Sequence, residues 1–317
     1  MDTISVVVPC YNEAEAIPLF YREICRVSDL MPDFDFEYLF VNDGSKDTTL
    51  QQIKTLAQTD RRVKYVSLSR NFGKESAMYA GFRYASGEYI AVMDADLQDP
   101  PSLLPDMMRG IRDEGYDCVA TRRVSRKGEP PLRSFFARLF YKLIRKLSKT
   151  EIVDGARDYR LLTRQYVDSL LELGEYNRFS KGLFGWCGYE TKWIEFENRE
   201  RAAGETKWSF WKLFLYSIDG IVAFSTVPLA IAALMGLLFC FLAFVFLLVI
   251  FVRALLFGDP VAGWPSLVCI ILLIGGIQML SMGILGEYLA KTYMETKHRP
   301  IFICKETNIR REEERLP

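Results

Sequence analysis

The sequence is poor in the residues from which several common kinds of active site are built. It contains one histidine, His298, so neither a histidine-based triad nor a histidine-ligated metal centre is expected. Its seven cysteines include no C-x-x-C pair, which argues against a zinc site and a disulfide framework and fits a reducing compartment. Neither G-x-G-x-x-G nor G-x-x-x-x-G-K-[ST] occurs, so we expect no dinucleotide-binding or P-loop domain.

Charge is balanced overall but unevenly distributed. The 40 Lys and Arg residues equal the 40 Asp and Glu residues, so no nucleic-acid partner is expected. Residues 220–252 and 260–286 contain no charge, and each stretch exceeds the roughly 20 residues that a membrane-spanning helix needs. Basic residues flank the pair, so the positive-inside rule predicts an integral membrane protein with both termini in the cytoplasm, as in a bacterial inner membrane. The N-terminal residues lead directly into an apolar run, so we expect no signal peptide.

Short apolar runs alternate with helical patterns through the first part of the chain. Runs at 4–9, 37–41, 63–68, 89–94 and 117–121 predict strands, and patterns through about 27 and at 47–59, 75–85 and 103–114 predict helices. This alternation predicts a doubly wound, mainly parallel α/β sheet. We expect a catalytic domain at 1–207, an amphipathic juxtamembrane helix at 208–224, two spans at about 225–252 and 262–286 within 225–290, and a cytoplasmic tail at 291–317.

Polar turns follow three of the predicted strands, at 9–13, 42–45 and 94–96. Ligands bind at the carboxyl ends of the strands in such sheets, so these turns predict one binding edge. Alternation places Asp94 and Asp96 on the same side of a strand end, where they could share a divalent cation. Mg²⁺ and Mn²⁺ prefer carboxylate and phosphate oxygens, which predicts a metal–diphosphate site. The alternative is a solvated acidic turn.

Several basic segments lie between this edge and the apolar stretches. Residues 122–128 and 199–207 are cation-rich loops, and either could be a solvated loop or an anion site. Residues 132–147 form a basic amphipathic pattern that could lie on a membrane, pack against another subunit or face the core of the domain. We expect Asp158 to open a helix that continues through Leu162.

Several ordered motifs resemble those of glycosyltransferase family 2, and more narrowly its polyprenyl-phosphate glycosyltransferases. They are V-P-C-Y-N-E at 8–13, V-N-D-G-S-K-D at 41–47, R-N-F-G-K-E at 70–75, M-D-A-D-L-Q-D-P-P at 93–101, D-Y-R-L-L at 158–162 and G-E-T-K-W at 204–208. The two-span tail is similar to that of the bactoprenol-glucosyltransferase branch. The resemblance implies a GT-A fold and an inverting transfer of a hexose to a polyprenyl phosphate. The leading candidate for the donor is UDP-glucose, which would supply glucose. GDP-mannose and UDP-amino sugars remain alternative donors, and a membrane scaffold or flippase component is the alternative class.

The resemblance also implies roles for individual residues. Pro9, Tyr11, Glu13 and Asp43 would hold the nucleotide, Asp94 and Asp96 would hold the metal, and Asp96, Gln98 and Asp158 would be catalytic. Independently of the resemblance, Lys74 lies where a loop opens the helix expected at 75–85, so it could contact the nucleotide sugar, neutralise a carboxylate or have a purely structural role.

The acceptor phosphate needs a cationic site, for which Arg122, Arg126, Arg201 and Lys207 are the candidates. Since a phosphate monoester is already largely ionised at neutral pH, we expect Asp158 to position a substrate more than to abstract a proton. Thr206 stands where the family more often has Ser, which is a mild change, and residues 155–157, directly before Asp158, also differ from the commoner family pattern. The uncharged helices could also pack into a small homo-oligomer.

Overall fold

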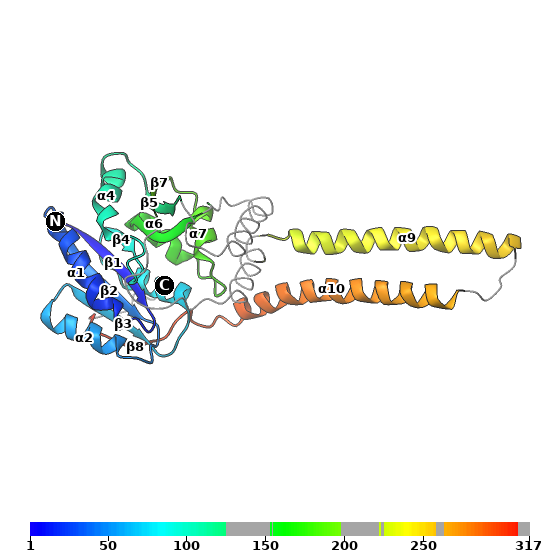
Figure 1. Cartoon of the computed structure of the whole chain (residues 1–317), viewed down its shortest axis with the longest axis horizontal. Coiled ribbons are helices and arrows are strands. Elements are labelled where there is room, and N and C mark those ends of the chain that lie inside the picture. Colours follow the sequence, from blue (N-terminus) through cyan, green and yellow to red (C-terminus); the bar gives the residue numbers. More distant parts are fainter. Residues whose placement is uncertain (125–152, 154, 198–221, 223–224, 258–262, 310–317) are drawn as a thin grey trace.

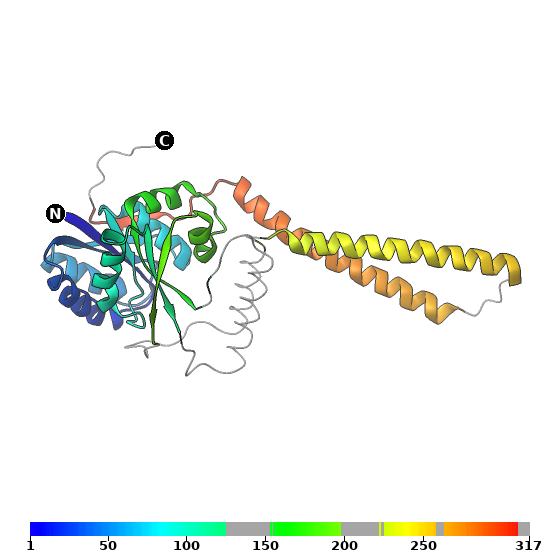
Figure 2. The ribbon, with the colours of Figure 1, turned by 90° about the horizontal axis from the view of Figure 1, so that it is seen from above.

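Two long helices project from an α/β domain, and both are joined to it at the same end (Figures 1 and 2). This computed structural model describes residues 1–124, 153, 155–197, 222, 225–257 and 263–309. The helix expected at 132–147, nearly all of that expected at 208–224, and Arg126, Arg201 and Lys207 lie outside the described residues.

The domain is built on an eight-stranded sheet with the order β7-β5-β6-β4-β1-β2-β3-β8. Its strands are β1 (Asp2–Cys10), β2 (Phe34–Asn42), β3 (Val63–Leu68), β4 (Tyr89–Val92), β5 (Cys118–Arg123), β6 (Ala156–Thr163), β7 (Thr191–Phe196) and β8 (Cys304–Thr307). Four neighbouring pairs are parallel, whereas β6 runs antiparallel to β4 and β5, and β8 runs antiparallel to β3. The expected mainly parallel α/β sheet is therefore confirmed.

Helices cover both faces of the sheet. One face carries α1 (Ala16–Asp29), α2 (Thr49–Thr59), the short 3-10 helix η1 (Pro101–Leu103) and α4 (Leu104–Arg112), and the other carries α3 (Lys74–Tyr84), α6 (Arg164–Glu172) and α7 (Ser180–Trp186). The central strand β1 shows why its sequence is a continuous apolar run. Val6 and Val8 pack into the first core and Val7 into the second, and all three are fully buried.

The segment that begins at Asp158 is a strand and not the start of a helix, so our expectation there was wrong. It lies within β6, between β4 and β5. Tyr159 and Leu161 pack into one core and Leu162 into the other, which is the two-sided burial of an interior strand. A five-residue apolar pattern alone does not distinguish a short buried strand from a helix.

The projecting pair consists of α9 (Val227–Phe257) and α10 (Trp264–Thr296), which lie side by side (Figures 1 and 2). The segments Val227–Phe246 and Leu273–Thr296 are long and apolar enough to cross a membrane, and neither is buried within the protein. Many large apolar side chains of both helices are exposed. Such surfaces are typical of helices in contact with lipid.

After α10 the chain returns to the α/β domain, which the sequence did not predict. Glu295, at the end of α10, accepts hydrogen bonds from the backbone N–H groups of Tyr176 and Asn177, both at 3.0 Å. Strand β8 then adds to the sheet edge beside β3, and its Glu306 pairs with Lys54 of α2 at 2.8 Å. Both ends of the helical pair are therefore connected to one domain.

Gly44, in the turn after β2, is required by both backbone conformation and space. Its φ is +64°, and a Cβ atom there would lie 2.4 Å from the carbonyl carbon of Arg70. Because this neighbour is a backbone atom, moving it aside would strain the chain. We expect Gly44→Ala to lower the free energy of unfolding by about 1–3 kcal/mol, measured by thermal unfolding of the detergent-purified full-length protein. Gly174→Ala is the matched control, since a Cβ atom added there would meet nothing within 4 Å and its φ is not positive. Equal melting temperatures for the two variants would contradict this prediction.

Candidate functional site

The loops after β1 and β2 are joined at the carboxyl edge of the sheet. Asn12 has a φ of +53°, its backbone N–H donates to Ser45 Oγ at 3.0 Å, and its Oδ1 accepts from the backbone N–H of Lys46 at 2.8 Å. Pro9, Tyr11 and Glu13 lie on or beside this connection. Their contact with a nucleotide stays a prediction, and the structure places all three at the expected edge.

Asp43, which follows β2, shapes the next loop. It is 3% exposed, and its carboxylate accepts hydrogen bonds from the backbone N–H groups of Phe72 at 2.7 Å and Gly73 at 2.9 Å. Burial raises the pKa of Asp43, and these two donors partly oppose the rise. Asp43 therefore holds the loop that delivers Lys74, a role that the sequence did not reveal. Its predicted contact with the nucleotide stays a prediction.

The loop after β4 carries the two aspartates of the D-x-D sequence. The backbone N–H of Met93 still bonds to Val7, so the strand pairing continues up to Asp94. Asp96 is 9% exposed, and its Oδ1 accepts a hydrogen bond from the backbone N–H of Gln98 at 3.1 Å. Leu97 between them has a φ of +56°, which gives the loop a tight turn. This hydrogen bond thus holds the Asp96 carboxylate within the turn.

Lys74 joins the β4 loop to β6. Its Nζ lies 2.7 Å from Asp94 Oδ1 and 2.5 Å from Asp158 Oδ2. The antiparallel register, in which Val92 pairs with Arg160, brings the two aspartates together. Burial alone would raise the pKa of Asp158, but the positive charges of Lys74 and Lys181 outweigh it and hold that pKa well below its usual range. The contact with Lys74 therefore favours the ionised form of Asp158.

A buried ion pair holds the end of the loop that follows β4. Arg157 Nε donates to Asp99 Oδ1 at 2.7 Å, and Asp99 is 1% exposed. Burial raises the pKa of Asp99 to about 6, although the charge of Arg157 opposes the rise. From the sequence, Arg157 was notable only as a departure from a family pattern. The structure shows that it connects β6 to the D-x-D loop.

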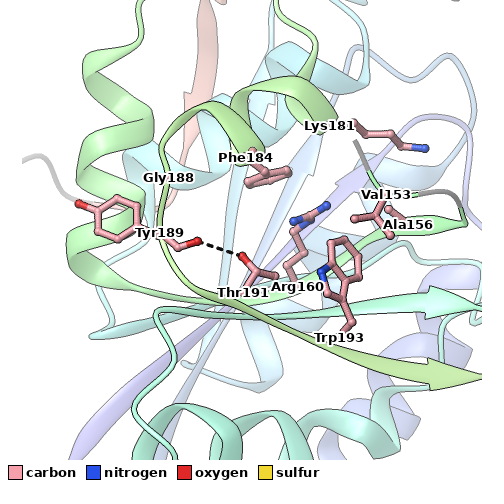
Figure 3. A pocket seen from close by; sticks show the side chains of 10 residues that line it. Val153, Ala156, Arg160, Lys181, Phe184, Gly188, Tyr189, Thr191 and Trp193 are labelled. Atoms are coloured by element: carbon pink, nitrogen blue, oxygen red, sulfur yellow. Dashed lines mark hydrogen bonds between the residues drawn. The ribbon is translucent and has the colours of Figure 1, made fainter. Parts of the chain in front are cut away.

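Of the four cations predicted to hold an acceptor phosphate, only Arg122 is among the described residues. It lies at the carboxyl end of β5 and forms an ion pair with Glu195 of β7. Two cations that we did not predict, Arg160 and Lys181, line a pocket with other residues of β6, α7 and β7 (Figure 3). Ser180, which precedes Lys181, donates from its backbone N–H to Glu75 at 2.9 Å, so α3 fixes the start of α7.

The carboxylates can be tested as ligands for a metal ion. Within the described ranges, no group of three or more His, Cys, Asp or Glu side chains could hold a metal. Mg²⁺ typically takes one or two carboxylates together with substrate phosphate oxygens and water. The donor set of Asp94 and Asp96 therefore fits a Mg²⁺ or Mn²⁺ ion that binds together with a diphosphate, and not a self-sufficient metal centre.

Comparison with known proteins gives a consistent set of relatives. The sequence profile of "Glycosyl transferase family 2" matches residues 5–171. A putative glycosyltransferase, CsbB of Bacillus subtilis, is 45% identical over 306 residues, which cover 96% of this chain and 92% of that protein. The bactoprenol glucosyl transferase of Shigella phage SfV and the prophage bactoprenol glucosyl transferase homolog of Escherichia coli K12 are each 41% identical over 302 residues, which cover 95% of this chain and 98% of each relative.

Proposed function

Because the chain belongs to glycosyltransferase family 2, we propose that it transfers a hexose from a nucleotide sugar to the phosphate of a polyprenyl carrier such as undecaprenyl phosphate. UDP-glucose is the proposed donor, and the transfer inverts the anomeric carbon and releases the nucleoside diphosphate. The relatives named bactoprenol glucosyl transferases align over nearly the whole chain and support this choice. The observation that carries it is the cluster of Asp94, Lys74 and Asp158 at the carboxyl edge of the sheet.

On the donor side, the loops after β1, β2 and β4 surround the nucleotide diphosphate. Asp94 and Asp96 hold a Mg²⁺ or Mn²⁺ ion, which when bound stabilises the negative charge on the departing diphosphate. Gln98, whose backbone N–H bonds to Asp96, is proposed to act on the same leaving group. Pro9, Tyr11 and Glu13 hold the base and the ribose.

On the acceptor side, the nucleophile needs little help from a base. A phosphate monoester has a second pKa near 6, so it is mostly ionised at neutral pH. The depressed pKa of Asp158 makes this carboxylate a poor proton acceptor, which supports a positioning role. Lys74 keeps Asp158 and Asp94 together although both are negative.

The connections of α9 and α10 suit an acceptor whose long tail stays in a bilayer. The pairing of β8, which follows α10, with β3 of the N-terminal domain supports a topology in which both ends of the helical pair lie on one side of a membrane. The basic residues around the pair favour the cytoplasmic side of a bacterial inner membrane. The exposed apolar faces of α9 and α10 also suit a small homo-oligomer.

A transfer assay tests this function directly. Full-length protein in detergent is mixed with undecaprenyl phosphate, Mg²⁺ or Mn²⁺, and labelled UDP-glucose, GDP-mannose or a UDP-amino sugar. We expect UDP-glucose to give organic-soluble label. EDTA should abolish this label and either metal should restore it, because two carboxylates alone leave the charge on the leaving diphosphate unbalanced. Faster transfer from another nucleotide sugar would show that this sugar, and not UDP-glucose, is the donor. The absence of transfer from every donor would favour a scaffold or flippase component.

A further inference from the structure

A pocket of about 270 Å³ lies between α7 and the strands β6 and β7 (Figure 3). Its lining includes two cations, Arg160 and Lys181, and the rings of Phe184 and Trp193. No carboxylate is found among the described residues that line it. The pocket is therefore cationic with aromatic walls.

Arg160 is a buried cation that has no counterion in the described part of the chain. It is 3% exposed, and its guanidinium carbon lies 4.1 Å from the ring centre of Phe184 and 5.2 Å from that of Trp193 (Figure 3). Among the described residues it forms no ion pair, and its Nε has no hydrogen-bond partner. Aromatic faces offset part of the cost of burying a guanidinium, but an N–H without an acceptor remains unfavourable. As far as the described residues extend, the pocket therefore lacks a negative hydrogen-bond acceptor.

The pocket adjoins the reacting centre. Arg160 follows Asp158 by two residues on β6, so both side chains lie on the same side of the sheet. Lys181 is close enough for its charge to act on Asp158, and it also lines the pocket. The contact of Glu75 with Ser180 fixes the turn of α7 that carries Lys181. An anion held here would lie beside the cluster of Lys74 and Asp158.

We propose that Arg160 and Lys181 bind the phosphate of the lipid acceptor, and that the aromatic walls contact the first apolar units of its chain. This deepens the proposed function and rests on it. The ligand chemistry is a phosphate monoester with an apolar substituent, in which the phosphate oxygens accept hydrogen bonds from the guanidinium and the ammonium groups. The site is distinct from the basic loops at 122–128 and 199–207, which the sequence suggested.

Ligand-induced stabilisation of the full-length protein tests the pocket without any donor. The probes are farnesyl phosphate and inorganic phosphate, and the variants are Arg160→Met and Lys181→Met, with Arg22→Met on the exposed side of α1 as the matched control. We expect farnesyl phosphate to raise the melting temperature of the wild type and of Arg22→Met, because a ligand that binds only the folded state stabilises it. The rise should be lost in Arg160→Met and Lys181→Met. An equal rise with inorganic phosphate would overturn the proposal, since the apolar chain would then contribute nothing.

Kinetics provide a second readout. In both pocket variants the KM for polyprenyl phosphate should rise about tenfold or more, while the KM for the nucleotide sugar stays unchanged, because each variant loses a charged phosphate contact. An unchanged acceptor KM would overturn the proposal.

Folding effects can be separated from binding. Without ligand, Arg160→Met should melt no lower than the wild type, because it removes an uncompensated buried charge. A lower melting temperature would show that Arg160 stabilises the fold, and it would overturn the proposed role of Arg160 in binding the phosphate. If the wild type transfers no sugar, the proposed function fails, whereas the farnesyl phosphate shift still decides whether the pocket binds a lipid phosphate.

Discussion

Asp96→Asn is expected to lower the turnover number for sugar transfer by about 10³-fold, because a metal ion contributes several kcal/mol of charge stabilisation at a leaving diphosphate. The substitution is nearly isosteric. The new amide keeps an oxygen that can accept the hydrogen bond from the backbone N–H of Gln98, so the loop should keep its shape. What is lost is the negative charge that a hard divalent cation requires. Initial rates at saturating donor and acceptor, over a series of Mg²⁺ and Mn²⁺ concentrations, measure the effect.

The proposed function assigns the two aspartates to the donor and other residues to the acceptor, which makes this prediction more specific. Asp94→Asn should have a similar effect on turnover, and both variants should still bind the polyprenyl phosphate acceptor. Asp106→Asn is the matched control, since Asp106 is an exposed carboxylate of α4 that pairs with Arg109 on its own helix. Acceptor binding that falls in parallel with turnover would show that the aspartates do not act on the donor alone.

The edge of the sheet could be predicted because its signals are local. A buried parallel strand appears as a short apolar run, and a polar turn directly after it marks the ligand edge. Asp94 and Asp96 combine both signals, and so does Asp43 after β2. The periodicity also predicted the alternation of strands and helices through residue 121, which the structure confirms.

The remaining features depend on contacts between distant parts of the chain. β6 lies between β4 and β5 in the sheet, and the residues of β6 alone do not predict this position. The same position creates the contact of Lys74 with Asp158, the pair of Arg157 with Asp99, and the burial of Arg160. β8 has only four residues and lies at the sheet edge, so it lacks the long apolar run that marks an interior strand.

Lys74→Met should change metal binding and turnover in opposite directions. Lys74 now balances two carboxylates, Asp94 and Asp158, which share its ammonium group. Without it these carboxylates face each other, and a divalent cation no longer competes with an ammonium for Asp94. We expect the affinity for Mn²⁺ to rise about tenfold, since the lost charge lies in direct contact with a metal ligand. Turnover should fall by about 10²-fold, as is typical when one charged group is removed from a preorganised site.

The opposite signs separate this role from simple loss of structure. Mn²⁺ affinity follows from titration of the donor-free protein, and turnover from the transfer assay at saturating metal. Lys192→Met is the matched control, because Lys192 also forms an ion pair, with Glu114, at the opposite edge of the sheet. Lys74→Arg keeps the positive charge and should restore the wild-type affinity for Mn²⁺ and part of the turnover. If metal affinity and turnover both fall in Lys74→Met, then Lys74 supports the D-x-D loop itself. If instead only turnover falls, the ammonium group acts on the substrates and does not compete for Asp94.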